Sequence, residues 1–198
     1  MLDKITAYIV DLIYETRPDT DASKRDIIEY GVFMTLSEII KIAVIVILGA
    51  IFNLLPYVLG SIVAMGVQRT VLGGTHAKSH KGCVAIHLIS VFFIITISLI
   101  SNVDRLYILP AAAIFSYSTI CKYAPADVPQ KPIKSAKQRK KLKAAGLAVV
   151  TVLFIISILV PTIWSNIIIL SCFVQAFFLT PLAYRLTKNK YSREEVSA

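Results

Sequence analysis

The sequence has little acid, and over three long ranges it has no charge at all. It contains 12 Asp and Glu residues against 21 Lys and Arg residues in a chain of 198. The ranges 42–68, 84–102 and 144–184 contain no Asp, Glu, Lys or Arg. A helix on the surface of a soluble protein keeps a polar face, so these ranges exclude a soluble helical domain. A bilayer core ~30 Å thick needs about 20 apolar residues as helix, and we therefore predict an integral membrane protein.

Cysteine is scarce as well, and its positions exclude a fold held together by disulfides. The chain has 3 cysteines, an odd number, and Cys121 and Cys172 lie inside apolar runs. The abundant residues are apolar, at 56% of the chain, against about 45–50% in soluble domains. The length of the chain predicts a single domain.

The apolar pattern predicts an all-α membrane bundle of about six membrane segments. Residues 2–16 place apolar side chains at helical spacing with charges between them, which is typical of an amphipathic helix on a membrane surface. Asn53 and Pro56 interrupt 42–68, so this range forms either two helices or one long tilted helix. The expected membrane segments are 38–55, 57–68, 84–101, 106–121 and the two halves of 144–184, which Pro161 divides.

The positive charge is concentrated in one basic run, Lys131 to Lys143, which contains no acid. Basic loops next to spanning helices stay in the cytoplasm and attract anionic lipids. Alternating crossings then place Cys83 at the cytoplasmic face too. A run of Lys and Arg is also typical of nucleic-acid binding. Apolar spans flank this run on both sides, however, so we expect no nucleic-acid partner.

One polar segment carries most of the reactive side chains. Ionisable groups beside membrane spans are functional suspects by default. Cys83 stands just before the predicted helix 84–101, whose N-terminal dipole favours a thiolate, and a nearby histidine can accept its proton. The alternative for Cys83 is a small buried apolar residue. All three histidines of the chain lie near this cysteine: His76, His80 and His87.

Spacing alone does not decide which histidine serves Cys83. His87 is four residues on and shares its helix face. His80 is three residues back and aligns only if the helix extends through Gly82. His76 needs a loop that folds back, although helix side chains tilt toward the N-terminus and therefore toward such a loop. A straight helix favours His87, and the choice stays open at this point.

Two rival chemistries use the same segment. His76, His80 and Cys83 offer three zinc ligands, but a zinc hydrolase needs a carboxylate base as in His-Glu-x-x-His, and no acid lies within the motif. Ser79 lacks the Gly-x-Ser-x-Gly elbow of a serine nucleophile. We therefore expect no metal and favour cysteine chemistry.

Arg69 and the glycine pair 73–74 open the polar segment. Arg69 is either an interfacial anchor that reaches the headgroups or a ligand for a substrate carboxylate or a developing oxyanion. Gly73 and Gly74 allow the loop backbone to approach a substrate chain closely.

Two motifs in this chain resemble the accessory gene regulator protein B family, AgrB. The resemblance covers nearly the whole chain, because the order of apolar segments also agrees. The first motif is Arg69…Gly74-Thr75-His76-Ala77…Cys83. The second, just before the basic run, is Lys122-Tyr123-Ala124-Pro125-Ala126-Asp127…Lys131-Pro132-Ile133.

The resemblance implies a bacterial membrane cysteine endopeptidase. Such an enzyme cuts a small precursor peptide, AgrD, on its C-terminal side and helps to form a cyclic (thio)lactone quorum-sensing signal. It implies that His76 is the general base and Cys83 the nucleophile, in place of the His87 that a straight helix favours. Arg69 and Gly74 match family positions and are expected to contact the substrate or the oxyanion.

The implied mechanism needs no cofactor. The Cys83 thiolate attacks a peptide carbonyl, and the resulting thioester is attacked by a thiol or hydroxyl within the bound peptide. The site must exclude water and hold this nucleophile close. The basic segment is expected to dock the acidic tail of the precursor by long-range attraction. The docking residues are expected to be Lys131, Lys140 and Lys141.

These expectations define one AgrB-like peptidase domain over 1–198. Its parts are N-terminal helices in 1–37, a catalytic half in 38–123, a basic cytoplasmic loop in 124–143 and a C-terminal hairpin and tail in 144–198. The expected partners are an AgrD-like peptide and a bilayer with anionic lipids, and a homodimer is left open. The expected location is the bacterial cell membrane. A non-catalytic exporter or channel is the alternative, but it would carry ionisable groups in mid-span.

Overall fold

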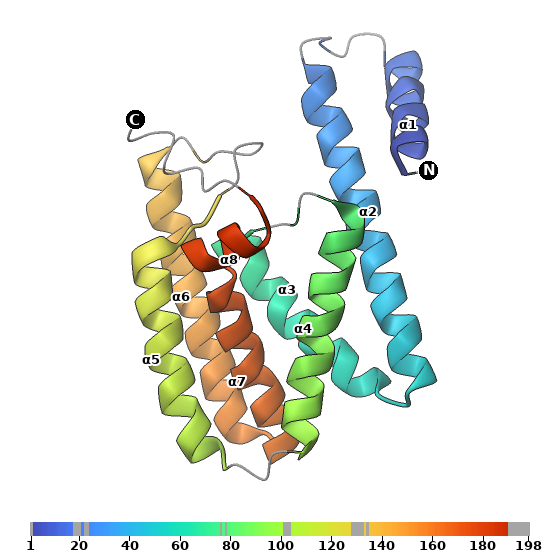
Figure 1. Ribbon diagram of the computed structural model, residues 1–198. Helices are drawn as coiled ribbons and strands as arrows, with labels where there is room; N and C mark the ends of the chain where they lie inside the picture. Colours follow the sequence, from blue (N-terminus) through green and yellow to red (C-terminus); the bar gives the residue numbers. More distant parts are fainter. Residues whose placement is uncertain are drawn as a thin grey trace. The chain divides into compact units, whose positions relative to one another are not determined.

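A computed structural model describes residues 2–17, 21, 24–75, 77, 79–100, 104–127, 133 and 135–189. Over these residues the chain is helical, with one isolated β-bridge and no strand. The predicted all-α class is confirmed. The helices in Figure 1 are α1 Leu2–Thr16, α2 Arg25–Ile51, α3 Leu55–Leu72, α4 His80–Ile100, α5 Arg105–Tyr123, α6 Ala136–Leu159, α7 Thr162–Phe177 and α8 Pro181–Leu186.

Several helices have the length and surface of membrane spans. Within the described ranges, α2, α3, α4 and α6 are long and apolar enough to cross a bilayer, and α7 is a shorter apolar helix. Large apolar side chains are exposed along them, among them Val63, Phe93 and Ile155. So much exposed apolar surface suits lipid rather than water. The protein is therefore a multi-pass helical membrane protein.

The chain divides into two compact units, Met1–Leu48 and Gly49–Ala198. In the first unit, Arg25 Nη2 lies 2.5 Å from Asp11 Oδ1, and this exposed pair contributes little to stability. α2 is continuous from Arg25 to Ile51, so the expected helix boundary at residue 38 was wrong. No proline interrupts this range, and the backbone hydrogen-bond ladder continues through it.

Residues 42–68 belong to two helices. Asn53 has a left-handed φ of 55°, and the Leu54 N–H donates to Gly49 O at 2.7 Å. Pro56 then lies in the first turn of α3, where a missing N–H costs no helix bond. α3 continues past the expected end at 68, because no helix-stopping residue occurs before Gly73.

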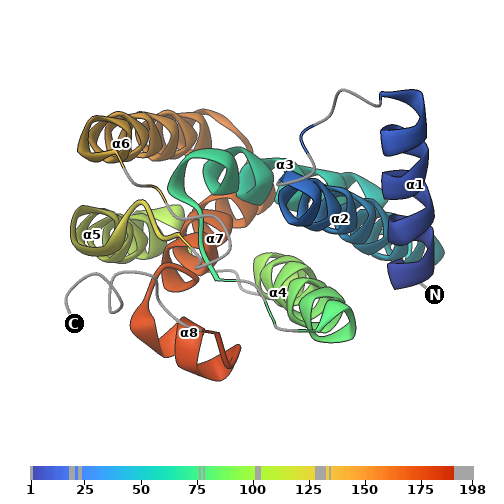
Figure 2. The same cartoon turned by 90° about the horizontal axis from the view of Figure 1, so that it is seen from above.

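The centre of the second unit is α7, which contacts α3, α4, α5 and α6, as Figure 2 shows. Small residues allow membrane helices to approach closely. A Cβ on Gly146 of α6 would lie 2.1 Å from Leu72 Cδ2 of α3, for example. The core formed in this way includes Leu72, Ile120, Val150, Phe154, Ile169, Cys172 and Leu179.

Candidate functional site

The glycine pair that follows α3 has a backbone that other residues adopt with difficulty. Gly73 has φ 73° and Gly74 has φ 130°. The Ala126 N–H donates to Leu72 O at 2.9 Å, and the Gly74 N–H donates to Ala126 O at 2.9 Å. A Cβ on Gly73 would lie 2.2 Å from Ala126 O. The close backbone approach seen here is thus between two segments of this chain, and the Gly74 N–H already has an acceptor.

The opposite side of the loop is held by α7 and the residues after it. The Gln175 side chain, which is fully buried, donates from Nε2 to Gly73 O at 2.8 Å. The Thr75 N–H donates to Phe178 O at 3.1 Å. The hydroxyls of Thr75 and Thr187 are 2.6 Å apart and hydrogen-bonded. The loop is therefore fixed from two sides before it reaches His76.

Arg69 is a half-buried residue in the last turn of α3, and it contacts the same loop. Its Nη2 donates to Thr75 O at 2.6 Å, and its guanidinium carbon lies 5.9 Å from the centre of the Phe178 ring. A cation over an aromatic face is favourable. The guanidinium thus connects the end of α3 to the loop and to the residue that follows α7.

Cys83 lies in the first turn of α4, and its side chain is buried. The residue is 7% exposed, and its N–H donates to Ser79 O at 3.0 Å. We expected the helix to start at 84, and it starts at His80 because the Ser79 hydroxyl accepts the Gly82 N–H at 3.1 Å. A serine in this role caps a helix N-terminus. His80 therefore shares α4 with Cys83, three residues before it.

His76 lies outside the described residues, so the expected approach of its ring to Cys83 stays a prediction. Lys131 lies outside them too, so its place relative to Lys140 and Lys141 also stays a prediction. Ala77, the residue after His76 in the chain, is among the described residues. A Cβ on Gly82 would lie 3.2 Å from Ala77 Cβ. The residue after His76 therefore packs against the residue before Cys83.

His87 occupies a different environment, one turn further along α4. Its Nδ1 lies 3.2 Å from the carbonyl oxygen of Cys83. Its ring stacks on Phe178, with centroids 6.1 Å apart and planes 17° from parallel. The Nδ1 contact is thus with the backbone of Cys83, and the ring face is covered by an aromatic side chain.

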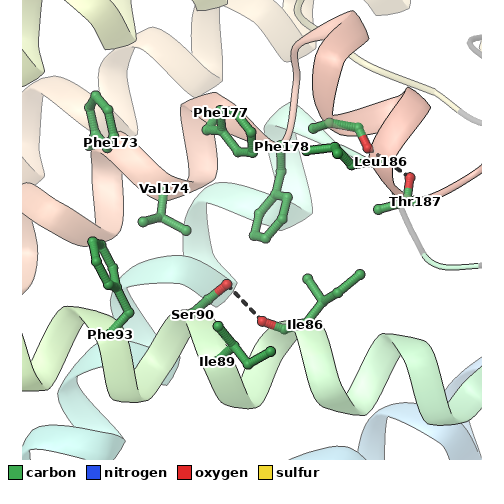
Figure 3. Close-up of a pocket in the computed structure, with 11 residues that line it drawn as sticks. Ile86, Ile89, Ser90, Phe93, Phe173, Val174, Phe177, Phe178, Leu186 and Thr187 are labelled. Carbon is green, nitrogen blue, oxygen red and sulfur yellow. Dashed lines mark hydrogen bonds between the residues drawn. The ribbon is translucent and has the colours of Figure 1, made fainter.

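An apolar cavity of about 390 Å³ adjoins this site, between α4, α7 and the α8 region. Figure 3 shows Phe178 and Ile86 at one part of its wall and Phe93 and Phe173 at another. Its one hydroxyl from α4, Ser90 Oγ, donates to Ile86 O at 2.8 Å. Phe178 therefore belongs both to this cavity wall and to the surroundings of Arg69.

Lysine and arginine side chains of the basic run differ in their surroundings. α6 begins at Ala136, so the second half of the expected loop is helical. Arg139 Nη2 lies 2.6 Å from Asp127 Oδ2, and Lys143 Nζ donates to Cys121 O. Lys140 and Lys141 are exposed. Among the described residues, no three His, Cys, Asp or Glu side chains cluster as metal ligands would.

Comparison with known proteins identifies the family. The profile of AgrB, accessory gene regulator B, matches residues 3–179. The chain belongs to the AgrB family. It is 26% identical over 172 residues to AgrB-like protein 2 of Clostridium perfringens strain 13, covering 84% of this chain and 80% of that protein. It is 27% identical over 157 residues to accessory gene regulator protein B of Staphylococcus aureus strain MRSA252, covering 79% and 83%. No solved structure matches the chain significantly.

The two AgrB-like motifs are in contact with each other. The bridge between Gly73 and Ala126 joins the glycine pair of the first motif to the Ala-Pro-Ala-Asp segment of the second. Their spacing in the sequence does not show that the two motifs touch. The resemblance to AgrB included Asp127 in a motif but assigned it no role, and it did not include Phe178 or Thr187 at all. Gln175, an amide side chain within an uncharged range, is a sequence signal that could have indicated the α7 contact.

Proposed function

We propose that this AgrB-family protein is a membrane cysteine endopeptidase, with Cys83 as nucleophile and His76 as general base. The observation that carries the proposal is how Thr75 and Ala77, the two neighbours of His76 in the chain, are held. Thr75 is bonded to Phe178 and Thr187, and Ala77 packs against Gly82, directly before Cys83. A histidine between two such anchors, whose following residue contacts the one before a helix-start cysteine, suits thiol activation.

The proposed reaction has two steps. In the first, the Cys83 proton moves to a ring nitrogen of His76, the sulfur bonds to a peptide carbonyl carbon, and the carbon–nitrogen bond breaks. The leaving amine takes the proton from His76, and the C-terminal tail departs. In the second step, a thiol or hydroxyl of the bound peptide attacks the thioester. A (thio)lactone ring forms, and the Cys83 sulfur leaves and regains a proton.

Arg69 is proposed both to hold the loop and to donate a hydrogen bond to the oxyanion. One N–H is used on Thr75 O, and a guanidinium has five N–H donors in all. A further donor aimed at the carbonyl oxygen would stabilise the charge that develops in the transition state. The Gly74 N–H is already bonded to Ala126 O, so we propose that Gly74 contributes its backbone conformation rather than an oxyanion contact.

The substrate proposed here is an AgrD-like precursor with an acidic C-terminal tail. Lys140 and Lys141 are exposed at the start of α6, where they suit long-range attraction of such a tail. Lys131 is proposed to take part with them. The same charges favour the cytoplasmic side of a bacterial cell membrane and contact with anionic lipids.

A purified, reconstituted protein with a synthetic precursor peptide tests the proposal. Cys83→Ala should abolish tail release, while Cys121→Ala, which removes an exposed cysteine of α5, should leave tail release intact. His76→Ala should be inactive and His87→Ala should retain activity. Mass spectrometry should detect a thioester on Cys83 that hydroxylamine removes. Tail release by Cys83→Ala at the wild-type rate would contradict the proposal of a cysteine endopeptidase. Transport of peptide by that variant would favour the alternative of a non-catalytic exporter.

The orientation of α6 in the membrane needs its own measurement, because it is proposed only from the tendency of basic loops to stay in the cytoplasm. A Lys140→Cys variant presents an exposed thiol on α6. A membrane-impermeant maleimide should label this thiol only after the cells are permeabilised. Labelling of the same thiol in intact cells would place α6 the other way round.

A further inference from the structure

Asp127 is a buried carboxylate that precedes the basic run. Its side chain is 2% exposed, and Oδ2 accepts both Arg139 Nη2 at 2.6 Å and the Ile133 N–H at 2.8 Å. Arg139 also donates from Nε to Ile133 O at 2.9 Å. One arginine of the basic run is thus committed to an acid of this chain, unlike the exposed Lys140.

The residue before Asp127 is bonded through its backbone to the loop that precedes His76. The neighbouring Ala126 donates to Leu72 O and accepts from the Gly74 N–H, at 2.9 Å each. The Asp127 carbonyl accepts the hydroxyl of Tyr184, a residue of α8 that is 2% exposed, at 3.1 Å. Asp127 therefore bonds to the start of α6 and to α8, and its neighbour Ala126 bonds to the glycine pair.

We propose that Asp127 and Arg139 are positioning residues, whose ion pair holds the 124–127 segment in register against the glycine pair and so sets His76 relative to Cys83. The inference rests on the proposed function for the role of His76. Breaking a buried pair leaves a charge without its partner in a poorly hydrated place. The 124–127 segment then shifts, and with it the loop that it pairs with.

The geometry distinguishes this role from substrate docking. A docking cation is exposed, and its loss weakens binding of an acidic tail. Arg139 is only partly exposed, with 23% of its side chain accessible, and its observed partners belong to this chain. Its loss should therefore lower the rate of the chemical step rather than the affinity, because a misplacement of about 1 Å can cost ~100-fold in rate.

The test compares Asp127→Asn, Arg139→Gln and Lys137→Gln in the reconstituted full-length protein. Asn keeps the shape of Asp and removes its charge, and Lys137 is an exposed cation two residues before Arg139. The first two variants should lower kcat about 10–100-fold while KM changes less than about twofold. Arg139→Lys, which keeps the charge and loses the bond to Ile133 O, should recover part of kcat.

A second measurement needs no peptide. The rate of Cys83 alkylation by iodoacetamide, followed across pH by mass spectrometry, reports the environment of the thiol. Asp127→Asn and Arg139→Gln should change this pH profile, and Lys137→Gln should leave it as in the wild type. If wild-type protein cleaves no precursor, the proposed function fails, and the alkylation profiles still decide the positioning role.

Tyr184→Phe distinguishes a loss of positioning from a loss of folding. It removes only the hydroxyl that donates to the Asp127 carbonyl. This variant should remain folded and show a smaller change in the same direction. If Asp127→Asn or Arg139→Gln unfolds, Tyr184→Phe and Arg139→Lys test the inference in its place. Folded variants with wild-type kcat and a wild-type alkylation profile would overturn the inference.

Discussion

The loop at 73–75 and the exposed lysines at the start of α6 are both part of the proposed site, yet they are held in opposite ways. The loop is bonded to Ala126, Gln175 and Phe178, and its backbone is tightly constrained. Lys140 and Lys141 are exposed. The difference indicates that the first region supplies geometry and the second supplies charge. Substitutions in the loop should therefore affect catalysis and stability, and substitutions of Lys140 and Lys141 should affect substrate affinity.

The largest effect is expected from Gly73→Ala. The φ of 73° disfavours any L side chain, and the new Cβ would meet Ala126 O at 2.2 Å. We expect a loss of about 2 kcal/mol or more in stability and no measurable tail release. Thermal unfolding in detergent and peptide cleavage would measure the two effects.

Gly66→Ala is the matched control for that substitution. Gly66 is an exposed glycine of α3, and a Cβ there would meet nothing within 4 Å. Alanine in a helix interior is favoured over glycine by roughly 0.5–1 kcal/mol, so this variant should be at least as stable as wild type. If both variants lose stability equally, the positive φ of Gly73 and its contact with Ala126 O do not constrain the loop as described.

A smaller effect is expected from replacing Lys140 and Lys141 together by Gln. Charges near an oppositely charged partner contribute about 1 kcal/mol or less each, so KM should rise about 3–10-fold with kcat unchanged. The dependence of KM on salt should weaken as well. Lys143 is left intact because it donates to Cys121 O. An unchanged KM and salt dependence would limit these lysines to topology and lipid contact.

The smallest effect is expected from Ser79→Ala. Its hydroxyl accepts the Gly82 N–H at the start of α4, and loss of a helix cap costs about 1 kcal/mol. Cleavage should fall only slightly, and the stability loss should be measurable by thermal unfolding. Ser90→Ala, whose hydroxyl bonds within α4 to Ile86 O, serves as a control away from the cap. A complete loss of cleavage in Ser79→Ala would assign Ser79 a direct chemical role.

The helical class and most of the helices could be predicted from the sequence. Ranges without charge cannot be solvated along one face, so 84–102 and 144–184 had to be apolar helices in lipid. Helix ends were predicted less well. Gly82 suggested a break before Cys83, but the cap at Ser79 carries α4 through it. The range 124–143 was expected to be a loop because it is rich in proline and lysine, yet the residues from Ala136 on favour helix and form the start of α6.

The sequence by itself determined the membrane helices and the motif in which His76 and Cys83 stand seven residues apart, because apolar runs and local spacing are properties of neighbouring residues. Only the tertiary structure decided what surrounds that motif. Thr75 bonds to Thr187, 112 residues away, and Gln175 bonds to Gly73, 102 residues away. An apolar pattern shows that a helix face will be buried, but it does not show which face of another helix will cover it. The packing of α7 against α3 and α4 made that choice.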